Sequence, residues 1–254
     1  MIESIGDKIP SNYIFATLLT GVYDVNRNEI IDDNDFSIIK KWYDSIIKLQ
    51  LNAIVFHNTF SKEIVEKYNN EYIQFIEIEY NTSLNPNVFR YFIYRDYIKE
   101  NFHEIENLFV TDITDVEVIN NPFESHMFAE NSDCLFCGDE PEILDNVWMR
   151  DHCSHLRNSM PDFGVYEALN QHETLLNCGI IGANITVMKL LFDKMVAIHD
   201  SFSYTNTSDY TLDMGVFNYV ARTTFLHKII HGEPVNTIFK KYESQRTDCW
   251  FRHK

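Results

Sequence analysis

The sequence is poor in glycine, proline and cysteine, and each shortage excludes a class of protein. Only 8 glycines and 6 prolines occur among 254 residues, which is too few for a collagen-like or loop-dominated chain. The five cysteines, at positions 134, 137, 153, 178 and 249, are an odd number, which argues against a framework of disulfides. The first three match no standard zinc-ligand spacing, so we expect buried thiols.

Basic residues are also scarce. The chain has 21 lysines and arginines against 38 aspartates and glutamates, and its net charge is −17. A chain this acidic repels a polyphosphate backbone, so we do not expect nucleic acid as a partner. A small anionic substrate would need a metal ion or a local group of basic side chains to overcome the same repulsion.

Long apolar runs are missing as well. No segment reaches the roughly 20 apolar residues that a transmembrane helix requires. The first residues show neither the basic nor the apolar part of a secretory signal. We therefore expect a soluble cytoplasmic protein without a membrane span.

The chain is instead rich in apolar and aromatic residues, at 45% and 14%, which is enough for a sizeable core. Strand-like runs alternate with segments of helical periodicity through its first half. We expect strands at residues 14–23, 51–58, 72–80, 108–119, 174–184, 225–232 and 249–254, and helices at residues 33–50, 61–71, 85–105, 185–202 and 210–223. Residues 123–160 have no clean period and are expected to be loops with a short strand near 134–138. This order predicts an α/β fold with a mostly parallel, Rossmann-like sheet flanked by helices, in one domain over residues 1–254.

Polar side chains follow three of the expected strands. In such sheets ligands bind at the carboxyl ends of the strands, near the point where the strand order reverses. The residues at these ends are Asp24 and Arg27 after the first strand, His57 and Asn58 after the second, and Asp112 and Asp115 after the fourth.

The two aspartates in LFVTDITDVEV are the strongest chemical signal. Asp112 and Asp115 stand three residues apart at the end of an apolar run. Burying carboxylates beside apolar neighbours is costly unless a cation or hydrogen-bond donors are close. Their hard oxygens suit Mg²⁺ or Mn²⁺, and such an ion would let an acidic protein hold a diphosphate. The alternative is two aspartates that cap backbone N–H groups in a turn.

This layout resembles the GT-A glycosyltransferases, in which a metal-binding Asp-x-Asp motif closes an apolar strand of a Rossmann-like sheet. In DITDVEVINNPF, Asp115 corresponds to the second carboxylate, whereas Asp112 lies three residues before it rather than two. The resemblance implies Asp115 as a metal ligand, with Asp112 on the metal, directly or through water, or on the ribose of the donor. It also implies Mn²⁺ or Mg²⁺ as cofactor and a nucleotide-diphosphate sugar as donor. Residues 1–120 would form the nucleotide-binding half and residues 121–254 the acceptor-binding half.

Further motifs follow in the order of the glycogenin-like enzymes, and the whole pattern is similar to viral and microbial members. LLNCGIIGAN resembles the loop that closes the sugar pocket, which implies Asn177 and Gly179 as donor contacts. A tight turn before a helix would use the same glycine. TLDMGVFN resembles the helix start whose carboxylate faces the acceptor, which points to Asp213. An ordinary aspartate in the first turn of a helix is the alternative.

A histidine near the C-terminus completes the metal site in many of these enzymes. Two histidines fit this position, His253 in CWFRHK and His231 in IIHGEPVNTIF, and the order of motifs favours His253. Lys254 beside it would be a cation for a phosphate.

The resemblance also implies donor contacts from the first strand and from the helix at residues 85–105. Thr20 lies in ATLLTG, and Asp24 and Arg27 in the loop after it would meet the base or the ribose. Arg90 would fork onto a phosphate or onto sugar hydroxyls. Arg95 lies about 140° further around the same helix, so we expect only one of the two arginines in the site.

The expected function is the metal-dependent transfer of a sugar from a nucleotide-diphosphate donor to a hydroxyl of a glycan or glycoconjugate. Asp213 would be the general base if the reaction inverts the anomeric carbon, or would stabilise an oxocarbenium-like centre if it retains the configuration. A sugar nucleotidyltransferase would use a similar sheet but normally has a Gly-rich basic loop after the first strand, where LTGVYDVNRNE offers one glycine and one arginine. The other alternative is a catalytically silent module that binds nucleotide sugars or glycans.

Overall fold

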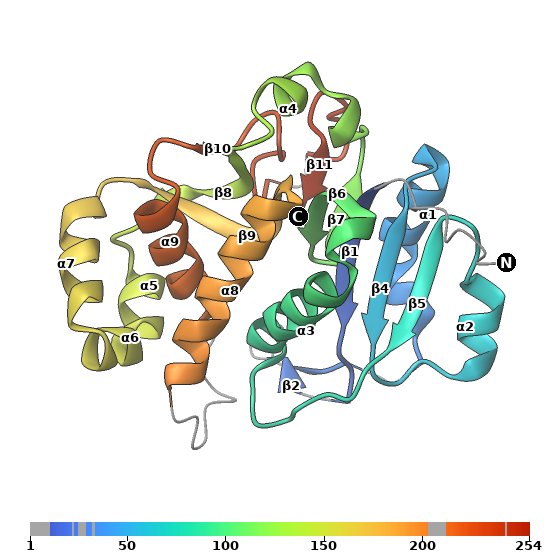
Figure 1. Ribbon diagram of the computed structural model, residues 1–254, viewed down its shortest axis with the longest axis horizontal. Helices are drawn as coiled ribbons and strands as arrows, with labels where there is room; N and C mark the ends of the chain where they lie inside the picture. The colour runs from blue at the N-terminus through green and yellow to red at the C-terminus, as the bar shows by residue number, and fades with distance from the viewer. Residues whose placement is uncertain (1–10, 22, 25–28, 32–33, 203–211, 242) are drawn as a thin grey trace, which may run out of the picture.

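A seven-stranded sheet organises the molecule, as the computed structural model in Figure 1 shows. The structure describes residues 11–21, 23–24, 29–31, 34–202, 212–241 and 243–254. The strand order is β10-β8-β9-β6-β1-β4-β5. In chain order the strands are β1 (Ser11–Leu18), β4 (Ala53–His57), β5 (Ile73–Glu77), β6 (Ile105–Thr111), β8 (Leu135–Ile143), β9 (Thr174–Asn184) and β10 (Ile229–His231).

The sheet is mixed and mostly parallel. β5, β4, β1 and β6 form a continuous parallel block, and β10 pairs in parallel with β8. Only β9 runs against its neighbours, β6 and β8. The expected α/β, Rossmann-like sheet flanked by helices is therefore confirmed, and one sheet joins both halves of the chain.

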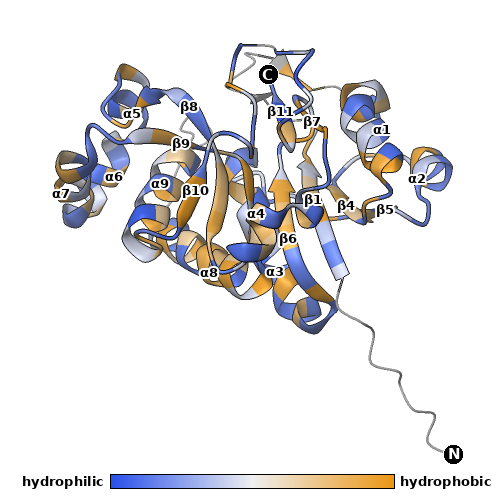
Figure 2. Cartoon of the chain, turned by 90° about the horizontal axis from the view of Figure 1, so that it is seen from above, coloured by the Kyte–Doolittle hydropathy of each residue, from blue (hydrophilic) through white to orange (hydrophobic). Residues whose placement is uncertain are grey.

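Helices cover both faces of the sheet, and each face has its own apolar core. Strand residues alternate between the two: Phe15 packs with the core under α3, α8 and α9, whereas Ile14 and Ala16 pack with the core under α1 and α4. The hydropathy colouring of Figure 2 shows the strands as largely apolar and the outer helices as mixed. The helices are α1 (Lys40–Leu49), α2 (Lys62–Tyr68), α3 (Pro86–Asn101), α4 (His126–Glu130), α5 (Val147–His152), α6 (Ser154–Ser159), α7 (Pro161–Asn170), α8 (Ile185–Ser201) and α9 (Asp213–Thr224), with short 3₁₀ helices at Phe36–Ile39, Phe102–Glu104 and Pro122–Glu124.

Two short antiparallel pairs stand outside the main sheet. β2 (Tyr23–Asp24) pairs with β3 (Glu29–Ile30). β7 (Val116–Val118) pairs with β11 (Phe251–His253), so the end of the chain returns to the segment that follows the two aspartates. None of the helices in the described part of the chain is long and apolar enough to cross a membrane.

The main departure from expectation lies in residues 123–160. They hold the nine-residue strand β8 and the helices α4, α5 and α6, where we expected loops and one short strand. β8 lacks a period of two because its first four residues are all buried and its last three are exposed. The expected strand at 108–119 is also divided: β6 ends at Thr111, and β7 begins at Val116. Both aspartates lie in the turn between the two strands.

Candidate functional site

A cavity of about 1000 Å³ opens beyond the carboxyl ends of β1 and β6, which is the edge where parallel sheets bind ligands. Both strands point their carboxyl ends to this edge because they are parallel. The cavity brings together eight of the predicted site residues: Arg90, Asp112, Asp115, Asn177, Gly179, Asp213, His253 and Lys254.

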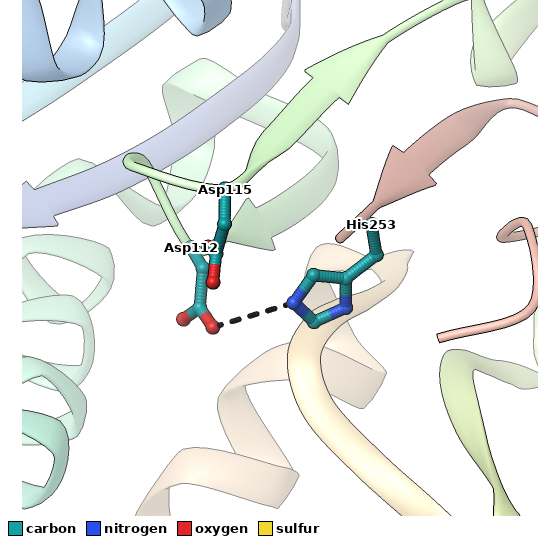
Figure 3. A group of neighbouring side chains, drawn as sticks. All are labelled: Asp112, Asp115 and His253. Atoms are coloured by element: carbon teal, nitrogen blue, oxygen red, sulfur yellow. Dashed lines mark ion pairs between the residues drawn. The ribbon is translucent and has the colours of Figure 1, made fainter. Parts of the chain in front are cut away.

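Asp112, Asp115 and His253 form the centre of this cavity, and we call them the Asp–His cluster. One ligand atom from each side chain lies within 4.8 Å of the others. Figure 3 shows the two carboxylates, on the turn after β6, pointing toward the imidazole on β11. The pairing of His253 with Val116 brings the imidazole to this turn, and the backbone N–H of Lys254 donates to the Asp115 carbonyl at 3.2 Å.

The imidazole of His253 is almost fully buried, at 1% exposure. Burial lowers its pKa from the ordinary value, against the opposing effect of Asp112, so we expect a neutral ring. Nε2 lies 3.8 Å from Asp112 Oδ2, and no hydrogen-bond partner for Nδ1 is found among the described residues. A neutral imidazole offers a nitrogen lone pair, which is what a metal ion requires.

The strand β9 supports the Asp–His cluster through a short chain of hydrogen bonds. Asp112 N–H donates to the Gly179 carbonyl at 2.7 Å, and Gly179 N–H donates to Asn177 Oδ1 at 2.7 Å. Gly179 has no room for a side chain, since a Cβ would lie 2.6 Å from both Asp112 Oδ2 and His253 Cε1. Asn177 and Gly179 therefore hold the backbone of Asp112 in place.

Arg90 joins two carboxylates of the cavity. Its guanidinium, on α3, makes an ion pair with Asp112 Oδ1 and a longer contact of 3.4 Å with Asp213 Oδ2. Asp213 lies in the first turn of α9, as expected, and also accepts a hydrogen bond from the Cys178 thiol at 3.3 Å. Burial raises the pKa of that thiol well above its ordinary value, so it stays protonated and can donate.

Arg95 points elsewhere, as the helical spacing predicted. Its guanidinium pairs with Asp96 at 2.8 Å and Asp200 at 3.8 Å, and it does not line the cavity.

The remaining candidates do not join the Asp–His cluster. Thr20 lines a second, smaller cavity of about 680 Å³ together with Asn58, whose side chain bonds both the N–H and the carbonyl of Thr20. His57 is buried against Phe60 and Phe75. Asp24 is in β2, but the structure does not describe its side chain. Arg27 lies outside the described residues.

His231, the second candidate for the histidine ligand, lies on β10 away from the cluster. Its Nδ1 is 2.9 Å from Asp139 Oδ2. The five cysteines are all free. Cys137 and Cys153 are buried as expected, whereas Cys134 is only partly buried. Among the described residues, the Asp–His cluster is the one group of three or more His, Cys, Asp or Glu side chains close enough to share a metal ion.

No sequence pattern pointed to the wall of the cavity that β8 and α5 form beside β9. Glu140, Glu142 and Trp148 line it. They lie in the stretch without a clean period, so no pattern in the sequence marked them. Only pairing β8 with β9 brings Glu140 beside Asn177, whose Nδ2 donates to Glu140 Oε1 at 3.0 Å.

The geometry thus unites three acidic or imidazole ligands, one buried arginine and a large cavity at the ligand-binding edge of the sheet. No protein-family model matches this chain, and no curated protein matches it significantly.

Proposed function

We propose that this protein is a metal-dependent glycosyltransferase of the GT-A type, which moves a sugar from a nucleotide-diphosphate donor to an acceptor hydroxyl. The observation that supports this most is the convergence, inside the cavity, of Asp112 and Asp115 on the turn after β6 with His253 on β11, which is far along the chain. A turn cap alone would not require a buried imidazole beside the two carboxylates.

The Asp–His cluster fits a divalent ion such as Mn²⁺ or Mg²⁺. It offers carboxylate oxygens and a neutral imidazole nitrogen that lie within 4.8 Å of one another. When bound, such an ion would supply positive charge to offset the negative charge that develops on the departing diphosphate. Arg90 would then serve to hold Asp112 in the orientation in which its other oxygen faces His253.

In the proposed reaction the bond between the anomeric carbon and the diphosphate oxygen breaks, and the nucleoside diphosphate leaves with the electron pair. A bond forms between the anomeric carbon and the acceptor oxygen, and the acceptor proton passes to a base. Asp213 lines the cavity and is held by Arg90 and Cys178, and we assign to it the orientation of the acceptor or the removal of its proton. Lys254, at the same cavity, would pair with a donor phosphate.

The direct experiment is thermal unfolding with UDP or GDP, each with and without Mn²⁺. We expect the melting temperature to rise substantially only when a nucleotide and the metal are both present, because each completes the other's site. Hydrolysis of a set of nucleotide sugars, with product analysis, then identifies the donor. If neither nucleotide shifts the melting temperature with Mn²⁺, the alternative of a silent glycan-binding module gains support instead.

Replacing Asp115 by Asn isolates the metal ligand, since it removes the charge and keeps the size. We expect Asp115→Asn to lose the joint effect of nucleotide and Mn²⁺ and the metal-dependent hydrolysis of the donor. Asp44→Asn is the matched control, because Asp44 is an exposed partner of Lys40 on α1, far along the chain from the cavity. Undiminished metal-dependent hydrolysis in Asp115→Asn would disprove the assignment.

A further inference from the structure

One wall of the cavity is built from the end of β8 and the start of α5. We call Glu140, Glu142, Asn146 and Trp148 the β8–α5 wall. The pairing of β8 with β9 is irregular at this point: Asp139 faces Leu176, and the next pair is Ile143 with Thr174. β8 therefore carries two more residues than β9 between these pairs, which makes residues 140–142 a bulge. Bulges beside ligand sites re-aim side chains, and Pro141 suits one because it has no N–H to donate to the sheet.

Glu140 is the best-fixed member of this wall. Its Oε1 accepts a hydrogen bond from Asn177 Nδ2. Asn177 Oδ1 accepts from the Gly179 N–H, and the Gly179 carbonyl accepts from the Asp112 N–H. The Glu140 carboxyl is thus connected to the Asp–His cluster through three consecutive hydrogen bonds. It is preorganised at the cavity surface instead of being a mobile surface carboxylate.

Trp148 supplies an aromatic surface on the same wall. Its indole is stacked on the His152 ring, with centroids 4.0 Å apart and planes at 14°, so one face is covered and the side chain is held in place. Trp148 is half-buried and lines the cavity, whereas the other two tryptophans, Trp42 and Trp250, are buried in the core. An aromatic face next to fixed hydrogen-bond acceptors is the combination that binds the apolar face and the hydroxyls of a pyranose ring.

The charge of the wall restricts which sugar can bind. Glu140, Glu142 and Asp145 are acidic, and Arg150 is already paired with Asp145 at 2.6 Å. Lys240 also lines the cavity, with its ammonium over the Phe239 ring at 4.8 Å, and it leaves the carboxylates in excess. A uronic acid or a phosphorylated sugar would be repelled here.

We infer that the β8–α5 wall is the acceptor subsite and that it takes an uncharged pyranose glycan, stacked on Trp148 and hydrogen-bonded by Glu140. The inference rests on the proposed function, which requires an acceptor beside the donor. It adds to that function the chemical class of the acceptor and two residues that hold it.

Tryptophan fluorescence of the wild-type protein tests this directly, because Trp148 is the one tryptophan within reach of a ligand in the cavity. The probes are neutral oligosaccharides of glucose, galactose, mannose and xylose, and oligogalacturonate as the anionic counterpart of the galactose series. We expect at least one neutral series to change the emission in a saturable way and oligogalacturonate to have no effect. A saturable response to oligogalacturonate as strong as to the neutral sugars, or no response to any neutral series, would overturn the inference.

Calorimetric titration of variants with the neutral glycan that responds tests the two residues. Trp148→Ala and Glu140→Gln should each weaken binding about tenfold or more, because one loses the aromatic face and the other a charged acceptor. Trp148→Phe should stay within about threefold of the wild type, because it keeps an aromatic face. Glu106→Gln, the same change at an exposed site near the start of β6, is the matched control and should bind normally. Equal affinity of Trp148→Ala and the wild type would contradict the assignment.

The two proposals fail separately. The stabilisation by nucleotide and Mn²⁺ tests the donor site and the proposed function, whereas glycan binding in the absence of nucleotide tests the wall. Glycan binding without any nucleotide effect would refute the transferase and keep the wall as a glycan-binding site, although no longer as an acceptor subsite. A nucleotide effect without glycan binding would keep the transferase and refute the wall.

Discussion

Gly179 occupies the most restricted position of the site. The space that a Cβ would fill is taken by Asp112 and His253, both of which are themselves held by the surrounding strands. We predict that Gly179→Ala lowers the free energy of unfolding by about 1–3 kcal/mol, the usual cost of overpacking. It should also abolish the combined effect of nucleotide and Mn²⁺ on the melting temperature, because the side chains of Asp112 and His253 must move apart to admit the methyl group.

Gly164 provides the control for this variant. It lies in α7, and a Cβ there would meet no atom within 4 Å. Gly164→Ala should leave the stability unchanged or raise it by up to about 1 kcal/mol, because alanine is the better helix former. Urea unfolding of both variants decides the matter, and equal stabilities of the two would show that the site tolerates the extra methyl group.

Arg90 and Arg95 allow a second comparison on one helix. Arg90 neutralises Asp213, whose side chain is 7% exposed, and Asp112, which is 31% exposed. We predict that Arg90→Met destabilises the protein by about 3 kcal/mol, because a buried carboxylate loses its partner. Arg95→Met should cost less than about 1 kcal/mol, since its partners Asp96 and Asp200 are 60% exposed. Denaturant midpoints measure both, and a larger loss for Arg95→Met would contradict this reasoning.

The side chains that meet in the cavity could be predicted to different degrees. Asp112 and Asp115 stand out in the sequence because two carboxylates follow an apolar run, whereas His253 was preferred to His231 because of the order of motifs in the resemblance. Glu140 and Trp148 could not be found in this way, because their place depends on the register between β8 and β9 and on a bulge within it. Thr20 was predicted as a donor contact because it lies in ATLLTG, but the turn after β1 carries it into the smaller cavity.

Among the elements, α8 packs against α3 and buries a histidine between them. His199 is fully buried and stacks on Tyr91, with ring centroids 6.4 Å apart. Burial lowers its pKa from 6.5 to about 3, so the folded state resists protonation while the unfolded chain accepts a proton below 6.5. The contribution of neutral His199 to the free energy of unfolding is therefore fully present above pH 6.5 and is lost as the pH decreases toward 3.

We predict that the wild type loses about 2 kcal/mol more than His199→Leu between pH 7 and pH 5, which follows from about 1.4 kcal/mol per pH unit below 6.5. Urea unfolding at the two pH values gives the difference. His126→Leu, at an exposed position on α4, should keep the acid sensitivity of the wild type. An identical pH dependence of His199→Leu and the wild type would show that another group is responsible.

Element boundaries were easiest to predict where one face of a segment is apolar throughout. β9 covers residues 174–184 and α8 residues 185–201, close to the expected ranges, because Asn184 caps the helix directly after a buried strand. The pair β7–β11 could not be predicted, since two three-residue strands carry little pattern of their own. Their pairing is held by contacts between distant residues, among them the ion pair of Arg252 with Glu117 at 2.6 Å.

At the scale of the whole molecule, the excess of negative charge is the dominant property. A net charge of −17 means that carboxylates repel one another across the surface. Raising the ionic strength from about 0.01 M to about 0.15 M shortens the screening length from about 30 Å to about 8 Å. We predict that the melting temperature rises over this range with NaCl, because screening removes more repulsion than it removes attraction from exposed ion pairs.

Calorimetry at constant pH measures this effect. The same series with equal ionic strengths of NaCl and KCl separates screening from specific ion binding, and the two salts should give the same shift. A melting temperature that falls with added salt would mean that ion pairs, and not net repulsion, govern the stability.

The return of β11 to β7 also has a consequence for biosynthesis. The imidazole belongs to residue 253, whereas the two aspartates and the supporting residues Asn177 and Gly179 precede residue 185 in the chain. Since proteins are made from the N-terminus onward, His253 is the last of these residues to leave the ribosome. Under the proposed function, the metal site would be completed only when β11 reaches β7, so a chain that ends before β11 should lack the joint effect of nucleotide and Mn²⁺ on the melting temperature.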